Sequence, residues 1–200
     1  MHTLILASGS PRRKELLERA GFLFSVHSIQ ISEIPNKNLS LHEQIEDLAR
    51  QKAFALVQSH NYPKLPKNLI LSSDTMVAIG DQVLGKPKDL DQSRQYLEML
   101  SGQRHSVITA ICIVSPSEKR EVVAHEESFV YFRKLSEEQI SSYVASGDGL
   151  DKAGAYGIQT LADGFIERIE GNIDNVMGLS IELVEKTLKE NNWHVDRRKS

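Results

Sequence analysis

The sequence has little cysteine, no long apolar run and almost no net charge. Its 200 residues include one cysteine, Cys112, so no disulfide can form within the chain, as is typical of a reducing compartment. The 24 Lys and Arg nearly balance the 27 Asp and Glu, and the net charge of −3 argues against a general nucleic-acid binder. Apolar runs such as 4–7 and 107–114 are far shorter than the roughly 20 residues that cross a bilayer, and the N-terminus lacks a signal-peptide pattern. We therefore expect a cytoplasmic protein that binds neither nucleic acid nor membrane.

The composition is that of an ordinary globular domain, with 40% hydrophobic and 26% charged residues. Neither an internal repeat nor a long Gly/Ser linker divides the chain, so residues 1–200 are predicted to form one bilobal domain.

Hydrophobic periodicity predicts a mixture of strands and helices. Strands are expected at 1–7, 69–79, 82–84, 106–114, 122–132 and 165–170, and helices at 10–20, 41–60, 91–100, 136–144 and 176–190. The pairs Ser40/Glu43 and Ser136/Gln139 have the spacing of capping boxes at helix starts. The pattern predicts an α/β fold with some antiparallel pairing.

The first candidate site is the turn between the opening strand and helix. Ser10 is placed as the N-cap, with Pro11 at the first helical position. Arg12 and Arg13 follow in the first turn, where cations are unfavourable unless an anion compensates them. This segment is either a site for an anion or an exposed basic turn without a ligand.

Asp74 is the second candidate, because it lies inside an otherwise apolar stretch. A buried carboxylate is costly unless it is paired, hydrogen-bonded or bound to a metal. Asp74 could activate water or hold Mg²⁺, or it could simply cap a strand bend.

Three further residues have alternative interpretations. Lys52 falls on the apolar stripe of the helix at 41–60, so it either extends to the surface or faces a cleft as a phosphate ligand. Lys86 ends a Gly-rich stretch with Walker A spacing, but Pro87 replaces the metal-binding Ser or Thr, which excludes a P-loop and leaves a lysine that could reach phosphate. Glu33 is either a second carboxylate for a metal or a surface residue.

The histidines are scattered without zinc-ligand spacing, and Cys112 lies in an apolar strand, which favours a structural thiol over a nucleophile. The loop at 151–159 is rich in Gly and Ala and ends at Gln159, whose amide could hydrogen-bond a base edge. A tight turn without a ligand is the alternative.

Five segments in this order resemble the Maf family of nucleoside triphosphate pyrophosphatases, over nearly the whole chain. They are SGSPRR at 8–13, SDT at 73–75, GKP at 85–87, SGQRH at 101–105 and DKAGAYGIQ at 151–159. The resemblance implies a Maf/ITPase-like α/β fold: a mixed, elongated sheet flanked by helices, in two lobes with a central cleft. It also implies hydrolysis of a nucleoside triphosphate to the monophosphate and pyrophosphate with a divalent cation, Mg²⁺ or Mn²⁺.

The resemblance assigns roles to individual residues. Asp74 matches the proton acceptor that activates water. The phosphate-binding residues are Ser8, Arg12, Arg13, Lys52 and Lys86; the positions associated with base selection are Arg12, Thr75 and Gln159; the metal would be held by Glu33 and Asp74. Because Ser32 precedes Glu33 where relatives often have two adjacent acids, the metal ligands depart from the usual pattern.

The SPRR and DKAGAYGIQ segments look like those of the dTTP/UTP branch. The 7-methyl-GTP branch typically has a tryptophan before the arginine pair and a different loop. A homodimer is expected for a cytosolic enzyme of this size. The alternatives are a pyrophosphatase of the same fold that acts on modified or non-cognate nucleotides such as methylated pyrimidines, a 7-methyl-GTP-type pyrophosphatase, or a regulator of cell division and septum formation without enzymatic activity.

Overall fold

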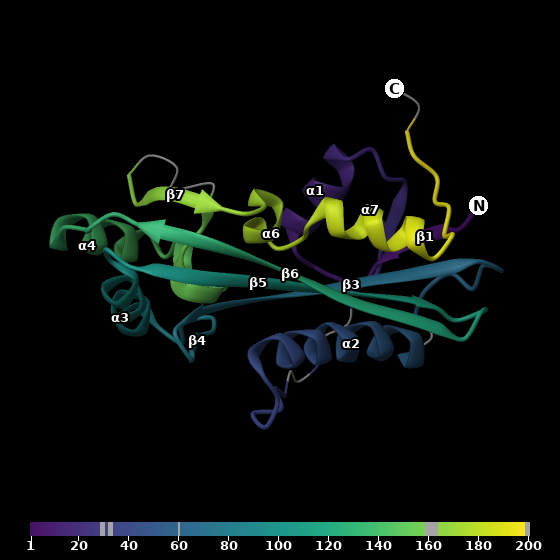
Figure 1. The fold of residues 1–200 in the computed structure, drawn as a ribbon, viewed down its shortest axis with the longest axis horizontal. Coiled ribbons are helices and arrows are strands. Elements are labelled where there is room, and N and C mark those ends of the chain that lie inside the picture. The colour runs from purple at the N-terminus through teal and green to yellow at the C-terminus, as the bar shows by residue number, and fades with distance from the viewer. Residues whose placement is uncertain (29–30, 32–33, 60, 159–163, 199–200) are drawn as a thin grey trace. The chain divides into compact units, whose positions relative to one another are not determined.

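The computed structural model describes residues 1–28, 31, 34–59, 61–158 and 164–198, which contain both strands and helices (Figure 1). The strands are β1 (Thr3–Leu6), β2 (Phe24–Val26), β3 (Asn68–Ile79), β4 (Gln82–Leu84), β5 (Arg104–Ser115), β6 (Arg120–Phe132) and β7 (Ile166–Glu170). The α-helices are α1 (Pro11–Arg19), α2 (Leu41–Ser59), α3 (Leu90–Leu100), α4 (Glu137–Ser146), α6 (Ile173–Met177) and α7 (Ile181–Glu190). Two 3-10 turns, η1 (Asp148–Asp151) and η2 (Ala153–Ala155), follow α4.

The strands form a mixed sheet in the order β2-β1-β3-β5-β6-β7, with β4 paired to β3. β1 runs parallel to both β2 and β3, whereas β4 and β7 pair antiparallel with β3 and β6. The apolar side chains of β1 are fully buried, as expected of a parallel strand covered on both faces. The predicted mixed α/β sheet flanked by helices is confirmed.

The described chain divides into two units. The first unit contains Met1–Asp74, Thr109–Glu126 and Gly178–Ser200, and the second contains Thr75–Ile108 and Glu127–Met177. In the first unit, α2 lies on one face of the sheet, and α1 and α7 lie on the opposite face (Figure 1). β3, β5 and β6 each contribute residues to both units.

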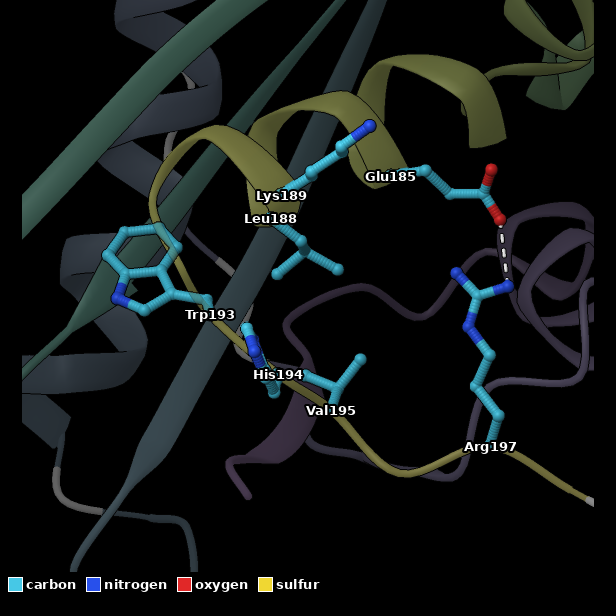
Figure 2. Close-up of a pocket in the computed structure, with 7 residues that line it drawn as sticks. All are labelled: Glu185, Leu188, Lys189, Trp193, His194, Val195 and Arg197. Carbon is cyan, nitrogen blue, oxygen red and sulfur yellow. Dashed lines mark ion pairs between the residues drawn. The ribbon is translucent and has the colours of Figure 1, made fainter.

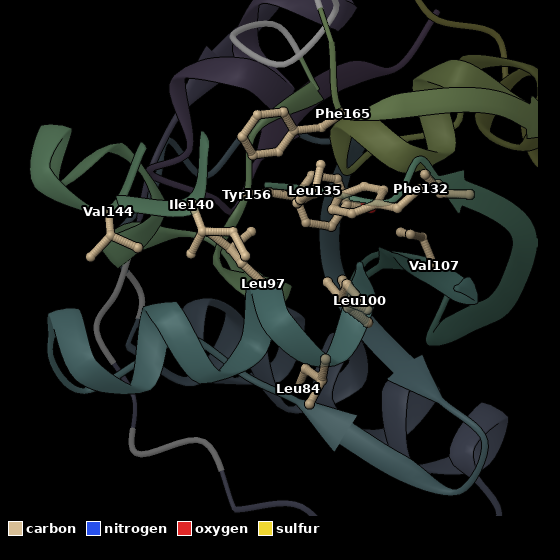
Figure 3. Packing of buried hydrophobic residues seen from close by; sticks show 12 residues of the cluster. Leu84, Leu97, Leu100, Val107, Phe132, Leu135, Ile140, Val144, Tyr156 and Phe165 are labelled. Atoms are coloured by element: carbon tan, nitrogen blue, oxygen red, sulfur yellow. The ribbon is translucent and has the colours of Figure 1, made fainter. Parts of the chain in front are cut away.

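The second unit has its own apolar core (Figure 3). Leu97 and Leu100 of α3 meet Ile140 and Val144 of α4 there, together with aromatic residues from β6 and from the loop after η2. Phe132 packs edge-on against Tyr156, with ring centroids 4.9 Å apart. Aromatic pairs with this geometry add stability beyond the area that they bury.

The predicted helix starts are confirmed at two capping boxes. The Ser40 backbone N–H donates to the Glu43 carboxylate at 2.9 Å, and Ser136 and Gln139 exchange both bonds of the box at the start of α4. These are local interactions, so short-range sequence signals were sufficient to identify them.

The prediction of one last helix over 176–190 is wrong. The chain forms α6 and α7 with a break at Gly178, whose φ of 109° lies outside the helical region and favours glycine. Ser180 then starts α7 as its N-cap, because its side chain accepts a hydrogen bond from the Leu183 N–H at 3.1 Å.

After α7 the chain returns alongside its own beginning. Val195 forms a bridge with His2, and Arg197 pairs with Glu185 at 2.8 Å. These C-terminal residues and the end of α7 line a surface hollow into which Leu188 and Val195 project (Figure 2). Among the described residues, no helix combines the length and apolar character needed to cross a membrane.

Candidate active site

The turn before α1 has the predicted arrangement. Ser10 is the N-cap in extended conformation and Pro11 is the first helical residue. The Ser10 side chain makes no capping bond; instead, its backbone N–H donates to Ser8 Oγ at 3.2 Å. Ser8 is buried, and the hydrogen bond that its hydroxyl accepts from the Ser10 N–H fixes the turn that leads into the helix.

The Arg13 side chain, on α1, contacts several other residues of the first unit. Its Nε donates to the Gly178 carbonyl oxygen at 2.8 Å, and its Nη1 donates to the Ser73 carbonyl oxygen at 2.6 Å. Nη1 also donates to Ser8 Oγ at 3.3 Å, and Nη2 lies 4.0 Å from Asp74 Oδ1. The anion expected beside this arginine at a helix start is thus the Asp74 carboxylate of the chain itself, and two neutral carbonyl oxygens accept further hydrogen bonds from the guanidinium.

Asp74 forms an ion pair that the sequence did not identify. Lys52 Nζ lies 2.6 Å from Asp74 Oδ1, and both side chains are largely buried, with 16% and 13% of their surface exposed. Lys52 therefore does not extend to the surface. α2 places this lysine so that it reaches β3, the strand that carries Asp74.

The group formed by Ser8, Arg13, Lys52, Ser73 and Asp74 contains one carboxylate and two cations. Breaking a buried pair leaves an uncompensated charge, so the two cations are what makes burial of the carboxylate tolerable. The ion pairs with Arg13 and with Lys52 both end on Oδ1 of Asp74. A carboxylate with one oxygen held by cations can still accept a proton on the other, and cations beside it can attract an anionic substrate.

In the second unit, the structure brings two predicted motifs together. The Gly154 N–H donates to the Gly85 carbonyl oxygen at 3.2 Å, which joins the GKP turn to the loop at 151–158. Gly154 has a φ of 71°, and a Cβ there would lie 2.9 Å from Val77 Cγ1, so both conformation and space require glycine. Lys86 is exposed and Thr75 is half-buried in this unit.

A third motif joins the same loop through a buried pair. His105 Nε2 lies 2.8 Å from the Tyr156 hydroxyl, and both residues pack against Phe132. Burial lowers the pKa of His105 to about 4 and raises the pKa of the Tyr156 phenol. The histidine is therefore neutral at pH 7 and acts as a core residue that fixes the loop.

The Asp148 carboxylate also orders this loop. It accepts hydrogen bonds from the Tyr143 hydroxyl at 2.6 Å and from Lys152 Nζ at 3.0 Å. The Tyr143 oxygen in turn accepts from the Gly157 N–H at 3.1 Å. The chain that leads into residue 158 is thus held by side chains from α4 and η1.

The remaining predicted residues have varied outcomes. Glu33 and Gln159 lie outside the described residues, and Arg12 is half-buried in the first turn of α1. Cys112 is a buried free thiol whose pKa is raised by burial to about 12, which supports the structural interpretation. Sequence reasoning missed Ser73 and Gly178 as hydrogen-bond partners of Arg13, although both lie in segments that it had noted.

The described residues do not fit a metal site made by the protein alone. Among them, no group of three or more His, Cys, Asp or Glu side chains is arranged to hold a metal ion. The Asp74 carboxylate is accompanied by Lys52 and Arg13, and positive neighbours repel a cation. Any divalent cation bound here would need ligands beyond these residues.

Known proteins are similar to this chain over most of its length. A family model described as Maf-like protein matches residues 3–191. A dTTP/UTP pyrophosphatase of Bdellovibrio bacteriovorus is 46% identical over 185 residues, which cover 92% of this chain and 96% of that protein. A dTTP/UTP pyrophosphatase of Geobacillus sp. (strain WCH70) is 40% identical over 96% of this chain and all of its own length. The structure of the Staphylococcus aureus Ham1 protein matches with a TM-score of 0.50 at 13% identity, covering 94% of this chain and 99% of that one, which shows the fold alone.

Proposed function

This chain belongs to the Maf family, and from that membership we propose that it hydrolyses dTTP and UTP to the monophosphate and pyrophosphate. The observation that carries the proposal is the 46% identity to a dTTP/UTP pyrophosphatase over 92% of the chain. The buried carboxylate of Asp74, with Lys52 and Arg13 beside it, is consistent with this chemistry. Water attack on a polyphosphate requires a base and compensation of negative charge rather than a covalent intermediate.

In this proposal, Asp74 accepts the proton of the attacking water. Because Lys52 and Arg13 both approach Oδ1, we assign the acceptor role to Oδ2. Lys52 and Arg13 also compensate the charge of the triphosphate, with Ser8, Arg12 and Lys86 as further phosphate ligands. Thr75, Gln159 and Arg12 contribute to base selection.

We also propose that the whole of residues 1–200 acts as one domain, in the cytoplasm and as a homodimer. The family model supports the first point, because it matches continuously across segments of both units. Analytical ultracentrifugation at micromolar concentration would test the dimer.

A substrate panel tests the function. We expect release of pyrophosphate from dTTP and UTP to exceed release from the purine triphosphates by at least about tenfold in kcat/KM, which corresponds to about 1.4 kcal/mol of discrimination. Pyrophosphate is measured with a coupled assay for dTTP, UTP, CTP, ATP, GTP and 7-methyl-GTP. Preference for 7-methyl-GTP would contradict the branch, and no release from any triphosphate would favour a role in the regulation of cell division.

We propose that a divalent cation, Mg²⁺ or Mn²⁺, is required and binds together with the triphosphate. The reason is that Mg²⁺ commonly combines few carboxylates with substrate phosphates, whereas two cations flank Asp74 here. We expect EDTA to abolish turnover and added Mg²⁺ to restore it.

The binding order has a separate readout. Electron paramagnetic resonance should show weak Mn²⁺ binding to the protein alone, and binding at least about tenfold tighter with the α,β-imido analogue of dTTP present. Equal Mn²⁺ affinity with and without the analogue would contradict the proposal.

A further inference from the structure

Ser73 reaches Arg13 by two routes. Its carbonyl oxygen accepts directly from Arg13 Nη1 at 2.6 Å. Its hydroxyl donates at 3.0 Å to the Gly178 carbonyl oxygen, and this same oxygen accepts from Arg13 Nε at 2.8 Å. The residue immediately before Asp74 therefore contributes to both carbonyl contacts of the arginine.

We propose that Ser73 is a positioning residue that orients Arg13 toward Asp74. A guanidinium is planar, so two donors fixed on two carbonyl oxygens determine the plane of the whole group. That plane sets where Nη2 lies, which is 4.0 Å from Asp74 Oδ1. The inference rests on the proposed function, in which Asp74 and Arg13 act on the triphosphate.

Gly178 supplies the second fixed point. Its φ of 109° is a conformation that other residues adopt only with strain, and it directs the carbonyl at the break between α6 and α7. The residue is buried, and the carbonyl oxygen accepts two donors, Arg13 Nε and Ser73 Oγ. Without the serine hydroxyl, this oxygen would be held in place by fewer hydrogen bonds.

Ser72 offers a matched control on the same strand. Both serines are fully buried, and the Ser72 hydroxyl donates to the Ala49 carbonyl oxygen at 2.6 Å, away from the arginine. Ser72→Ala and Ser73→Ala thus each remove one buried hydroxyl with one strong backbone acceptor. A purely structural role would make the two variants similar.

The test is a double-mutant cycle on pyrophosphate release from dTTP. We expect Ser73→Ala to lower kcat between about 10- and 100-fold, the range that misplacement of a reactive group produces, and Ser72→Ala to stay within about twofold. In an Arg13→Lys background, Ser73→Ala should cause less than about a twofold further loss, because the hydroxyl acts through the guanidinium. An unchanged kcat in Ser73→Ala, or the same loss in both backgrounds, overturns the inference.

A second readout does not depend on activity. Nuclear magnetic resonance of protein labelled with ¹⁵N-arginine resolves Nε–H signals, and the signal missing in Arg13→Lys belongs to Arg13. We expect its exchange with water to be at least about fivefold faster in Ser73→Ala and unchanged in Ser72→Ala, because exchange reports opening of the hydrogen bond to Gly178. Wild-type exchange in Ser73→Ala overturns the inference. A wild-type protein that hydrolyses no triphosphate refutes the proposed function instead, and the exchange rates then decide the inference alone.

Discussion

We expect Asp74→Asn to lower kcat for dTTP by a factor of about 1,000, within the range attributed to general bases. The amide keeps the size of the side chain and an oxygen for Lys52, but it cannot accept the proton of the attacking water. Binding of the α,β-imido analogue of dTTP, measured by calorimetry, should remain within about fivefold of wild type, because the loss concerns the transition state rather than the ground state.

Asp196→Asn is the control, since Asp196 is an exposed aspartate of the same unit. This substitution removes one negative charge and leaves Asp74 unchanged, so kcat should remain within about twofold of wild type. An Asp74→Asn variant with more than a tenth of wild-type turnover would remove this residue from its proposed role.

We expect acid to lower the free energy of unfolding by about 3 kcal/mol through His105. The pKa of its imidazole is about 4 in the folded chain against 6.5 for an unperturbed histidine, and each pKa unit of difference is worth about 1.4 kcal/mol. Between these two values, the unfolded chain binds the proton and the folded chain does not. The contribution of His105 to the free energy of unfolding is therefore complete above pH 6.5, declines as the pH falls and is lost near pH 4.

Urea unfolding at several pH values between 7 and 4 measures this effect. His105→Gln removes the titrating group, so its free energy of unfolding should fall less across this window than that of wild type, by about 3 kcal/mol. His194→Gln, at an exposed histidine, should follow the wild-type profile. Parallel profiles for His105→Gln and wild type would contradict the prediction.

The sequence was sufficient where structure depends on neighbours along the chain. Capping residues such as Ser136 and Gln139 interact across three positions, and the apolar periodicity of α2 is local as well. The prediction of a single helix over 176–190 is wrong because the helix breaks at Gly178. The positive φ of Gly178 accompanies two tertiary hydrogen bonds to its carbonyl oxygen, and no local sequence pattern reveals such contacts.

For the site, the sequence indicated that Asp74 and Lys52 are charged residues in apolar surroundings, but not which groups compensate their charges. A buried carboxylate such as Asp74 is costly unless it is paired, and the ammonium group of Lys52, on an apolar stripe, has to reach either solvent or an anion. The structure joins these two residues at 2.6 Å, although they lie on different elements and 22 positions apart along the chain. The assignments of Thr75 and Lys86 remain predictions, since the resemblance and not a contact supports them.

The division of the chain has a consequence for its synthesis. The first unit takes its last segment from Gly178–Ser200, after the chain has passed through the second unit twice. A ribosome-bound chain that has emerged only to α4 therefore contains Asp74 and Lys52 but lacks the carbonyl that anchors Arg13 Nε. Because neither unit is a continuous piece of chain, neither can fold as an early, independent product of translation. The environment of Arg13 is thus completed only by the last segment of the first unit, and a chain ended by a premature stop before residue 178 would carry the carboxylate and the lysine without the second carbonyl contact of the arginine.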